Sequence, residues 1–387
     1  MASGDDVFVP ATRQCPCVQP VVAAGGRYNF DMDQVLTFPG TARPSRADSA
    51  RSRIAVWLLV CCALVFIMVV VGGVTRLTRS GLSIVEWQPI AGTLPPLTTE
   101  AWEAAFAKYR ETPEYLKVNH GMTLDEFKGI FWWEYIHRLL GRTIGLVFLL
   151  PLLWFAIRRQ IGRSLLPRLV GIFCLGGIQG AIGWWMVKSG LVDTPRVSHV
   201  RLAVHLGTAF LIFSAMFWTA LDLLAPDRPS RRSPQRSALA RWALVLCAWI
   251  LVMVLSGALV AGTRAGYAYN TFPLMDGHWV PPGLAGLSPW WDNLFHNLTT
   301  VQFNHRMIAW SLFFLVPLFW WRSRRIELPE AARRPINLLL GMLAVQITLG
   351  ISTLLLHVPI ALGAAHQGGA LVLLALALWS AHALRRA

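Results

Sequence analysis

Charged residues are scarce in this chain: they make up 14% of its 387 residues, whereas hydrophobic residues make up 55%. A soluble domain carries about a quarter charged residues. Among the charged residues, the acidic ones are the fewer, with 20 Asp and Glu against 35 Lys and Arg. This composition excludes an ordinary water-soluble domain and predicts that most of the chain lies in a lipid bilayer.

Cysteine is also sparse, with 6 in the whole chain. Four of them fall in apolar segments: Cys61, Cys62, Cys174 and Cys247. The predicted outer loops contain none, so no disulfide framework is expected. Cys15 and Cys17 form a Cys-Pro-Cys sequence near the N-terminus, but no second pair follows at the spacing of a metal site.

The N-terminal segment lacks the apolar core of a secretory signal peptide and the acid-poor composition of a transit peptide. It mixes Asp, Pro, Gly and Ser instead. Residues 1–50 are therefore predicted to form a disordered cytoplasmic tail. Met32 is a second candidate for the start of translation.

Long apolar segments fill the rest of the chain. A helix needs about 20 apolar residues to cross the hydrocarbon layer, and eight segments meet this length. They are predicted near 54–74, 132–156, 168–187, 200–222, 242–263, 301–321, 336–357 and 361–383. The sequence thus predicts an all-α, polytopic membrane protein with eight transmembrane helices in contact with membrane lipid.

Basic residues, mainly arginines, cluster in every second connection between these segments and at both ends of the helical region. By the positive-inside rule these loops and both termini are cytoplasmic. The formal charge of +15 is then explained by topology, and no nucleic-acid partner is expected. A bacterial inner membrane is the predicted location, with the mitochondrial inner membrane as the alternative.

An internal repeat relates the first four apolar segments to the last four. Four sets of residues in the first unit have a counterpart in the second. The matches are Glu134–Arg138 with Gln302–Arg306, Gln179 and Gly183 with Gln346 and Gly350, His205–Ala209 with His366–Ala370, and Thr75-Arg76 with Thr263-Arg264. Each unit has an even number of segments, so both have the same orientation. The prediction is two pseudo-symmetric four-helix bundles over 51–225 and 242–387, joined by a cytoplasmic linker over 226–241.

Four histidines, His137, His205, His305 and His366, occupy equivalent places near the outer ends of alternate segments. Histidines on alternate helices of one bundle can both coordinate a haem iron. A single intramembrane histidine is more often a hydrogen-bonded packing residue, but the repetition favours axial ligands. His120, His278, His296 and His382 are not expected to be ligands, and the roles of His199 and His357 stay open.

Arginines accompany these histidines. Arg138 and Arg306 directly follow two of them, and Arg76 and Arg264 begin outer loops. Arginine binds carboxylates in bidentate fashion, so these four are candidate partners of haem propionates. Snorkelling of each side chain to the interface is the alternative.

The two halves differ at one position of the histidine motif. Glu134 precedes His137 on the same helical face, whereas Gln302 precedes His305. The difference predicts that proton chemistry belongs to the N-terminal half, with Glu134 as its base, and that the C-terminal half holds a haem for structure or electron transfer. Favourable interaction of Glu134 with the helix dipole is the alternative explanation.

These motifs together resemble the haem A synthase family, most closely its mitochondrial and α-proteobacterial branch. The matching segments run in order from about Val70 to the last helix: Gly72–Thr78, Ser80–Trp87, Glu134–Arg138, Tyr269–Met275, Phe303–Arg306 and Ala365–Gln367. The first outer loop has no cysteine pair, unlike one bacterial branch of the family, which argues against a thiol relay there.

The resemblance implies an oxidoreductase that converts a ring methyl of haem O into a formyl group, giving haem A for cytochrome c oxidase. It implies that His137 and His205 bind the substrate haem, that His305 and His366 bind a resident haem b, and that Glu134 is needed for activity. Expected partners are haem O, haem O synthase and an electron acceptor or donor whose identity is open. The source of the inserted oxygen and the oligomeric state, a homo-oligomer included, also stay open.

Two other functions fit the same histidines. A dihaem electron carrier of the cytochrome b type would use both pairs without altering its haem, although Glu134 and the outer-loop motifs disfavour it. A haem transporter or chaperone would need an exit path for haem.

Overall fold

A computed structural model describes residues 46–88, 91–192, 194–225 and 233–386. The predicted N-terminal tail, with Cys15, Cys17 and Met32, lies outside the described residues, as does most of the linker. The linker was predicted to extend to 241, but α7 begins at Pro234. Ser233 caps this helix by accepting a hydrogen bond from the backbone N–H of Arg236, which explains why the helix starts before the apolar segment does.

Eight long helices make up the structure. They are α1 (Arg46–Leu77), α4 (Leu124–Ile157), α5 (Leu165–Leu191), α6 (His199–Leu224), α7 (Pro234–Thr263), α8 (Leu298–Arg324), α9 (Glu330–Leu355) and α10 (Ile360–Arg386). All eight overlap the predicted segments, and all but α7 and α9 extend them at both ends. α7 ends at Thr263, as predicted. α9 ends at Leu355, two residues early, because His357 and Val358 adopt left-handed conformations before Pro359.

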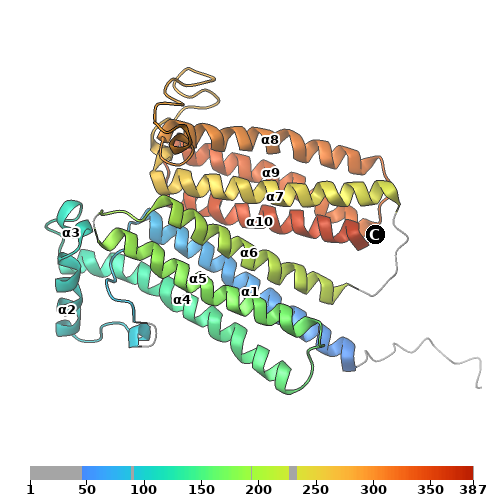
Figure 1. The fold of residues 1–387 in the computed structure, drawn as a ribbon, viewed down its shortest axis with the longest axis horizontal. Helices are drawn as coiled ribbons and strands as arrows, with labels where there is room; N and C mark the ends of the chain where they lie inside the picture. The colour runs from blue at the N-terminus through green and yellow to red at the C-terminus, as the bar shows by residue number, and fades with distance from the viewer. Residues whose placement is uncertain (1–45, 89–90, 193, 226–232, 387) are drawn as a thin grey trace, which may run out of the picture. The chain divides into compact units, whose positions relative to one another are not determined.

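Each half of the chain forms a closed ring of four helices. In the first, α1 packs on α4, α4 on α5, α5 on α6 and α6 on α1; in the second, α7 to α10 close the same ring. The rings meet where α6 packs on α7 and α10 and where α1 packs on α10, so these helices lie side by side (Figure 1). This arrangement confirms the prediction of a polytopic all-α protein built from two four-helix bundles.

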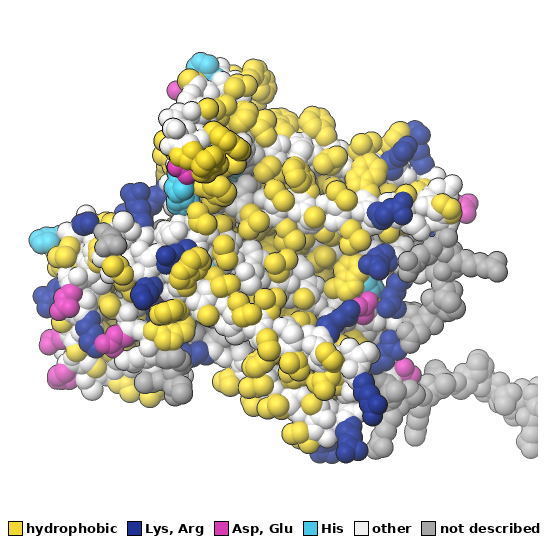
Figure 2. Space-filling view, viewed as in Figure 1, with side chains coloured by type: hydrophobic (Ala, Val, Ile, Leu, Met, Phe, Trp, Pro, Cys, Tyr) yellow, Lys and Arg dark blue, Asp and Glu magenta, His cyan; other side chains and the backbone are white. Residues whose placement is uncertain are grey.

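Seven of these helices are long and apolar enough to cross a membrane. The remaining one, α8, has a similar length but carries the polar residues Asn304, His305 and Arg306, so the predicted count of eight spans is not confirmed. Hydrophobic side chains cover the visible middle of the helices, and Lys and Arg gather toward their ends (Figure 2). Apolar residues such as Leu150 and Phe314, 61% and 63% exposed, are suited to contact with lipid.

The connection between α1 and α4 is more ordered than an outer loop was expected to be. It contains α2 (Thr99–Arg110) and α3 (Pro113–Lys117), which begin at the capping residues Thr98 and Thr112. Tyr109, wholly buried, packs with Phe127 and Phe131 of α4. The aromatic cluster fixes this small cap on the end of α4 that carries the histidine motif.

Candidate functional site

The four predicted ligands fall on diagonal helices of the two bundles. His137 is on α4 and His205 on α6, while His305 is on α8 and His366 on α10. The members of each pair lie within electrostatic range of one another. All four side chains are half-buried. The structure therefore brings the histidines together in the predicted pairs, one pair across each bundle.

Each of these imidazoles lies against a glycine of the preceding long helix. A Cβ atom built on that glycine would stand only 2.9–3.1 Å from the imidazole Cε1 atom. The pairs are Gly72–His137, Gly183–His205, Gly257–His305 and Gly350–His366. Any larger residue would displace the ring, so the glycines help to set where each imidazole points. Sequence reasoning missed Gly257, although its place before α8 repeats that of Gly72 before α4.

Two glutamines hold one histidine of each pair in the same way. The Gln179 side-chain amide donates to the backbone carbonyl of His205 over 2.9 Å and lies 3.2 Å from its Nδ1 atom. Gln346 makes the same two contacts with His366 at the same distances. This agreement confirms the predicted equivalence of the two positions and gives both glutamines a role.

The structure corrects one part of the repeat. Arg264 was matched with Arg76, but its structural counterpart is Arg79. Both Arg79 and Arg264 adopt a left-handed backbone conformation at the end of their helices, with φ of 55° and 62°. Each also stands at the same distance along the chain from its histidine-contacting glycine, Gly72 or Gly257. The match between the two short Thr-Arg sequences had therefore aligned Arg264 with the wrong arginine of the first half.

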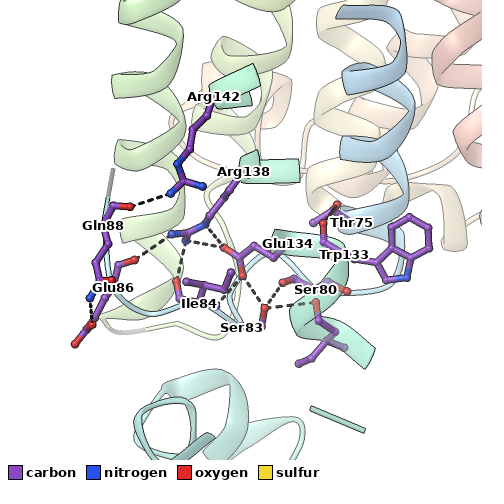
Figure 3. A network of polar contacts seen from close by, with 11 residues as sticks. Thr75, Ser80, Ser83, Ile84, Glu86, Gln88, Trp133, Glu134, Arg138 and Arg142 are labelled. Atoms are coloured by element: carbon purple, nitrogen blue, oxygen red, sulfur yellow. Dashed lines mark hydrogen bonds and ion pairs between the residues drawn. The ribbon is translucent and has the colours of Figure 1, made fainter. Parts of the chain in front are cut away.

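Glu134 is buried, 3% exposed, and both of its carboxylate oxygens are engaged. Oε1 accepts hydrogen bonds from Arg138, at 2.7 Å from Nη2 and 3.0 Å from Nε. Oε2 accepts from the Ser83 hydroxyl and the Ile84 backbone N–H, each at 2.8 Å (Figure 3). Glu134 thus ties the loop that follows α1 to the helical turn that carries His137.

Arg138 completes this connection rather than pointing away from the protein. Its guanidinium also donates to the backbone carbonyls of Ile84 and Glu86, at 2.8 and 3.1 Å (Figure 3). The C-terminal half repeats the arrangement without a carboxylate. Arg306 donates to the carbonyls of Tyr269 and Thr271, each at 2.9 Å, and the Gln302 amide also donates to Tyr269. In each half, these side chains hold the loop that follows the first long helix close to a histidine.

Arg76 and Arg264, in contrast, come from different bundles and lie within electrostatic range of each other. Their side chains make no hydrogen bond or ion pair with any other residue in the described part of the chain. Burial, and next the charges of Arg79 and Arg196, lower the pKa of Arg264. Several guanidinium groups thus lie within electrostatic range of one another at the seam between the bundles.

Comparison with known proteins identifies the family. The COX15-CtaA family model, described as cytochrome oxidase assembly protein, matches residues 55–378. The chain belongs to this family. The match includes all four histidines and Glu134.

Among curated members of the COX15-CtaA family, a protein of Nitrosospira multiformis named heme A synthase is 60% identical, over 89% of this chain and 97% of its own length. Proteins with the same name from Nitrosomonas eutropha and Paramagnetospirillum magneticum are 57% and 51% identical. They cover 84% and 89% of this chain, and 92% and 97% of their own lengths.

The histidine sites fit the haem that this family would be expected to bind. Paired imidazoles from diagonal helices are a donor set typical of a haem iron. The amide nitrogens of Gln179 and Gln346 lie 3.2 Å from Nδ1 of His205 and His366, and the Ser256 hydroxyl lies 2.9 Å from Nδ1 of His305. The fourth, His137, has a buried Nδ1 with no hydrogen-bond partner in the described structure.

Other histidines lie apart from these pairs. The rings of His199 and His296 meet edge to face with centroids 4.9 Å apart, and His357 is in the turn that follows α9. His382 is buried near the other end of α10 and lies 3.0 Å from the Asp222 carboxylate. His382 thus has a polar partner within the protein.

Proposed function

We propose that this chain is a haem A synthase, an oxidoreductase that converts a ring methyl of haem O into a formyl group to supply haem A for cytochrome c oxidase. The names of its relatives support the proposal. The structural observation that carries it is the His137–His205 pair with the buried carboxylate Glu134 one helical turn from His137. The other half has a histidine pair but an amide, Gln302, at the matching position.

The two pairs would serve different haems. His137 and His205 would hold the substrate haem, and His305 and His366 would hold a resident haem b. A bound haem supplies an iron whose oxidation state can change, so electrons can leave the substrate. The acceptor of those electrons belongs to a partner whose identity the chain does not specify.

Formation of a formyl group from a methyl group adds one oxygen atom, from water or dioxygen, and removes protons as well as electrons. Glu134 is the buried carboxylate closest along the chain to a substrate-side ligand and would accept a proton. Its hydrogen bond from Ser83 offers a polar neighbour to which a proton could pass. Its Oε1 atom also forms an ion pair with Arg138.

The propionates of the haems would be neutralised by Arg76 and Arg264, because their guanidinium groups have no partner within the described chain. Arg138 and Arg306 would act mainly by holding the outer loops, since their donors already contact loop carbonyls. This division refines the prediction that treated all four arginines alike.

The protein is a multi-pass membrane protein. Its bacterial relatives support a bacterial inner membrane, and the distribution of basic loops supports a topology with both termini in the cytoplasm. Haem O would enter from the lipid phase or from haem O synthase. Neither an interaction with that enzyme nor a homo-oligomer is needed to complete either histidine pair, because each pair lies within one chain.

Pigment analysis of the purified full-length protein tests the function. The chain is co-expressed with a source of haem O, and the extracted haems are identified by mass spectrometry. Haem A is expected from the wild type and not from His137→Ala. His305→Ala should lose low-spin haem absorbance. Recovery of unaltered haem alone would reject the synthase in favour of an electron carrier or a haem transporter.

A further inference from the structure

His305 has a hydrogen-bonding neighbour that its counterpart lacks. The hydroxyl of Ser256, on α7, lies 2.9 Å from His305 Nδ1. Ser256 immediately precedes Gly257, the glycine against which the His305 ring packs. The same short segment of α7 therefore sets both the position and the hydrogen bonding of this imidazole.

The direction of this hydrogen bond follows from the other contact of the serine. Ser256 Oγ also lies 2.8 Å from the backbone carbonyl of Met253, which can only accept. The single hydroxyl proton is directed to Met253, so the contact with His305 requires a proton on Nδ1. The serine thus selects the tautomer whose Nε2 lone pair is available to a metal.

The first bundle has valine at this place. Val71 immediately precedes Gly72, which contacts His137 as Gly257 contacts His305. A valine side chain cannot accept a hydrogen bond. His137 Nδ1 is accordingly buried without a partner among the described residues. The opposite ligands share a neighbour, because Gln179 and Gln346 lie at the same distance from Nδ1 of His205 and His366.

We propose that Ser256 is a positioning residue that makes His305 a strong, fixed haem ligand, and that Val71 leaves His137 a weaker ligand from which haem can be released. The inference rests on the proposed function and names the difference between its cofactor site and its substrate site. Donation from Nδ1 to an acceptor orients the imidazole and raises the basicity of the ligating nitrogen. A resident haem benefits from this, whereas a haem that must leave as product does not.

The test isolates one pair at a time. In a His137→Ala background, only the His305–His366 pair remains complete. There, Ser256→Ala should bind haem b about 10–100-fold more weakly and raise its midpoint potential, because the less basic imidazole stabilises ferric iron less. Ser256→Thr keeps the hydroxyl and should behave like the parent. Titration of haem into the detergent-solubilised full chain, followed by optical redox titration, measures both quantities.

The reciprocal change gives the matched control. In a His305→Ala background, Val71→Ser should strengthen haem binding at the His137–His205 pair and slow its loss during washing. Equal haem affinity and potential for Ser256→Ala and its parent would overturn the inference, as would a Ser256→Thr variant as weak as Ser256→Ala. These readouts need no turnover, so failure of the wild type to make haem A would reject the proposed function separately.

Discussion

Glu134 and Arg138 form a buried ion pair on one face of α4, with 2.7 Å between the carboxylate Oε1 and the guanidinium Nη2. The two side chains are 4% and 17% exposed. A pair held by two charge-assisted hydrogen bonds is more rigid than an exposed one. The ion pair lies one helical turn from His137 and is hydrogen-bonded to the loop after α1. The Glu134 carboxylate therefore has a structural role in addition to its proposed chemical one.

Replacement of Glu134 by glutamine separates these two roles. The amide oxygen of Glu134→Gln can still accept from Ser83 and from the Ile84 N–H, so the loop and the haem content should be retained. Loss of the carboxylate base should lower the yield of haem A by at least about 100-fold. Haem extraction and the optical spectrum of the purified variant measure the two effects.

Arg138→Gln is the matched variant, because it breaks the same ion pair but leaves the carboxylate in place. It should keep measurable haem A production while loosening the loop, seen as faster proteolysis or amide exchange over residues 80–88. Normal haem A from Glu134→Gln would show that Glu134 has only the structural role.

A methyl group added beside a histidine should displace that ligand. Gly257→Ala would place a Cβ 3.1 Å from His305 Cε1, and Gly72→Ala would place one 2.9 Å from His137 Cε1. We expect a cost of about 1–3 kcal/mol in each case. Gly257→Ala should deplete the resident haem b and Gly72→Ala the substrate-side haem, as measured by haem-to-protein ratio. Gly145→Ala is the control, since nothing lies within 4 Å of its Cβ position.

Removal of the unpaired guanidinium groups should weaken haem binding. Arg76→Gln and Arg264→Gln each delete a charge at the seam between the bundles without breaking a hydrogen bond within the described chain. We expect about a 10-fold loss of haem affinity for each, the equivalent of about 1.4 kcal/mol. Arg163→Gln, on the exposed connection between α4 and α5, should leave titration curves unchanged. Equal affinities for all three variants would contradict propionate binding by Arg76 and Arg264.

The cap formed by α2 and α3 should become less stable as the pH rises toward neutrality. Burial, and next the negative charge of Glu134, raise the pKa of the Glu114 carboxyl to about 7. In the unfolded chain it would titrate near 4.3, at about its ordinary value. Between these two pKa values the folded state binds more protons than the unfolded state. The contribution of Glu114 to the stability of the cap is therefore fully present below the lower pKa and is lost as the pH approaches 7.

Hydrogen exchange in α2 and α3 measures this effect. Amide protection should fall between about pH 5 and pH 7, by up to about 3 kcal/mol in opening free energy. Glu114→Gln stays neutral and should remove the pH dependence while it keeps a polar partner for the Tyr109 hydroxyl, which lies 3.5 Å from the native carboxylate. An unchanged pH dependence in this variant would assign it to another group.

Much of the architecture could be predicted from the sequence, because a lipid bilayer constrains a chain strongly. Long apolar segments must form helices there, since no water satisfies their backbone groups. The internal repeat then predicted the bundles and the four histidines. The prediction was less accurate where polarity obscures the pattern: α2 and α3 were treated as loop, and α8, with Asn304 and Arg306 in its first turns, does not reach the apolarity of a membrane span.

The sequence by itself determined which residue types recur at matching places, because the repeat preserves spacing. Only the tertiary structure decided what those residues contact. It directs Arg138 and Arg306 to loop carbonyls, brings Arg76 to Arg264 across the seam, and places Ser256 within hydrogen-bond reach of His305. These contacts join segments far apart in the chain, and hydrogen bonds depend on ångström-scale distances and angles that helix packing sets and residue spacing does not.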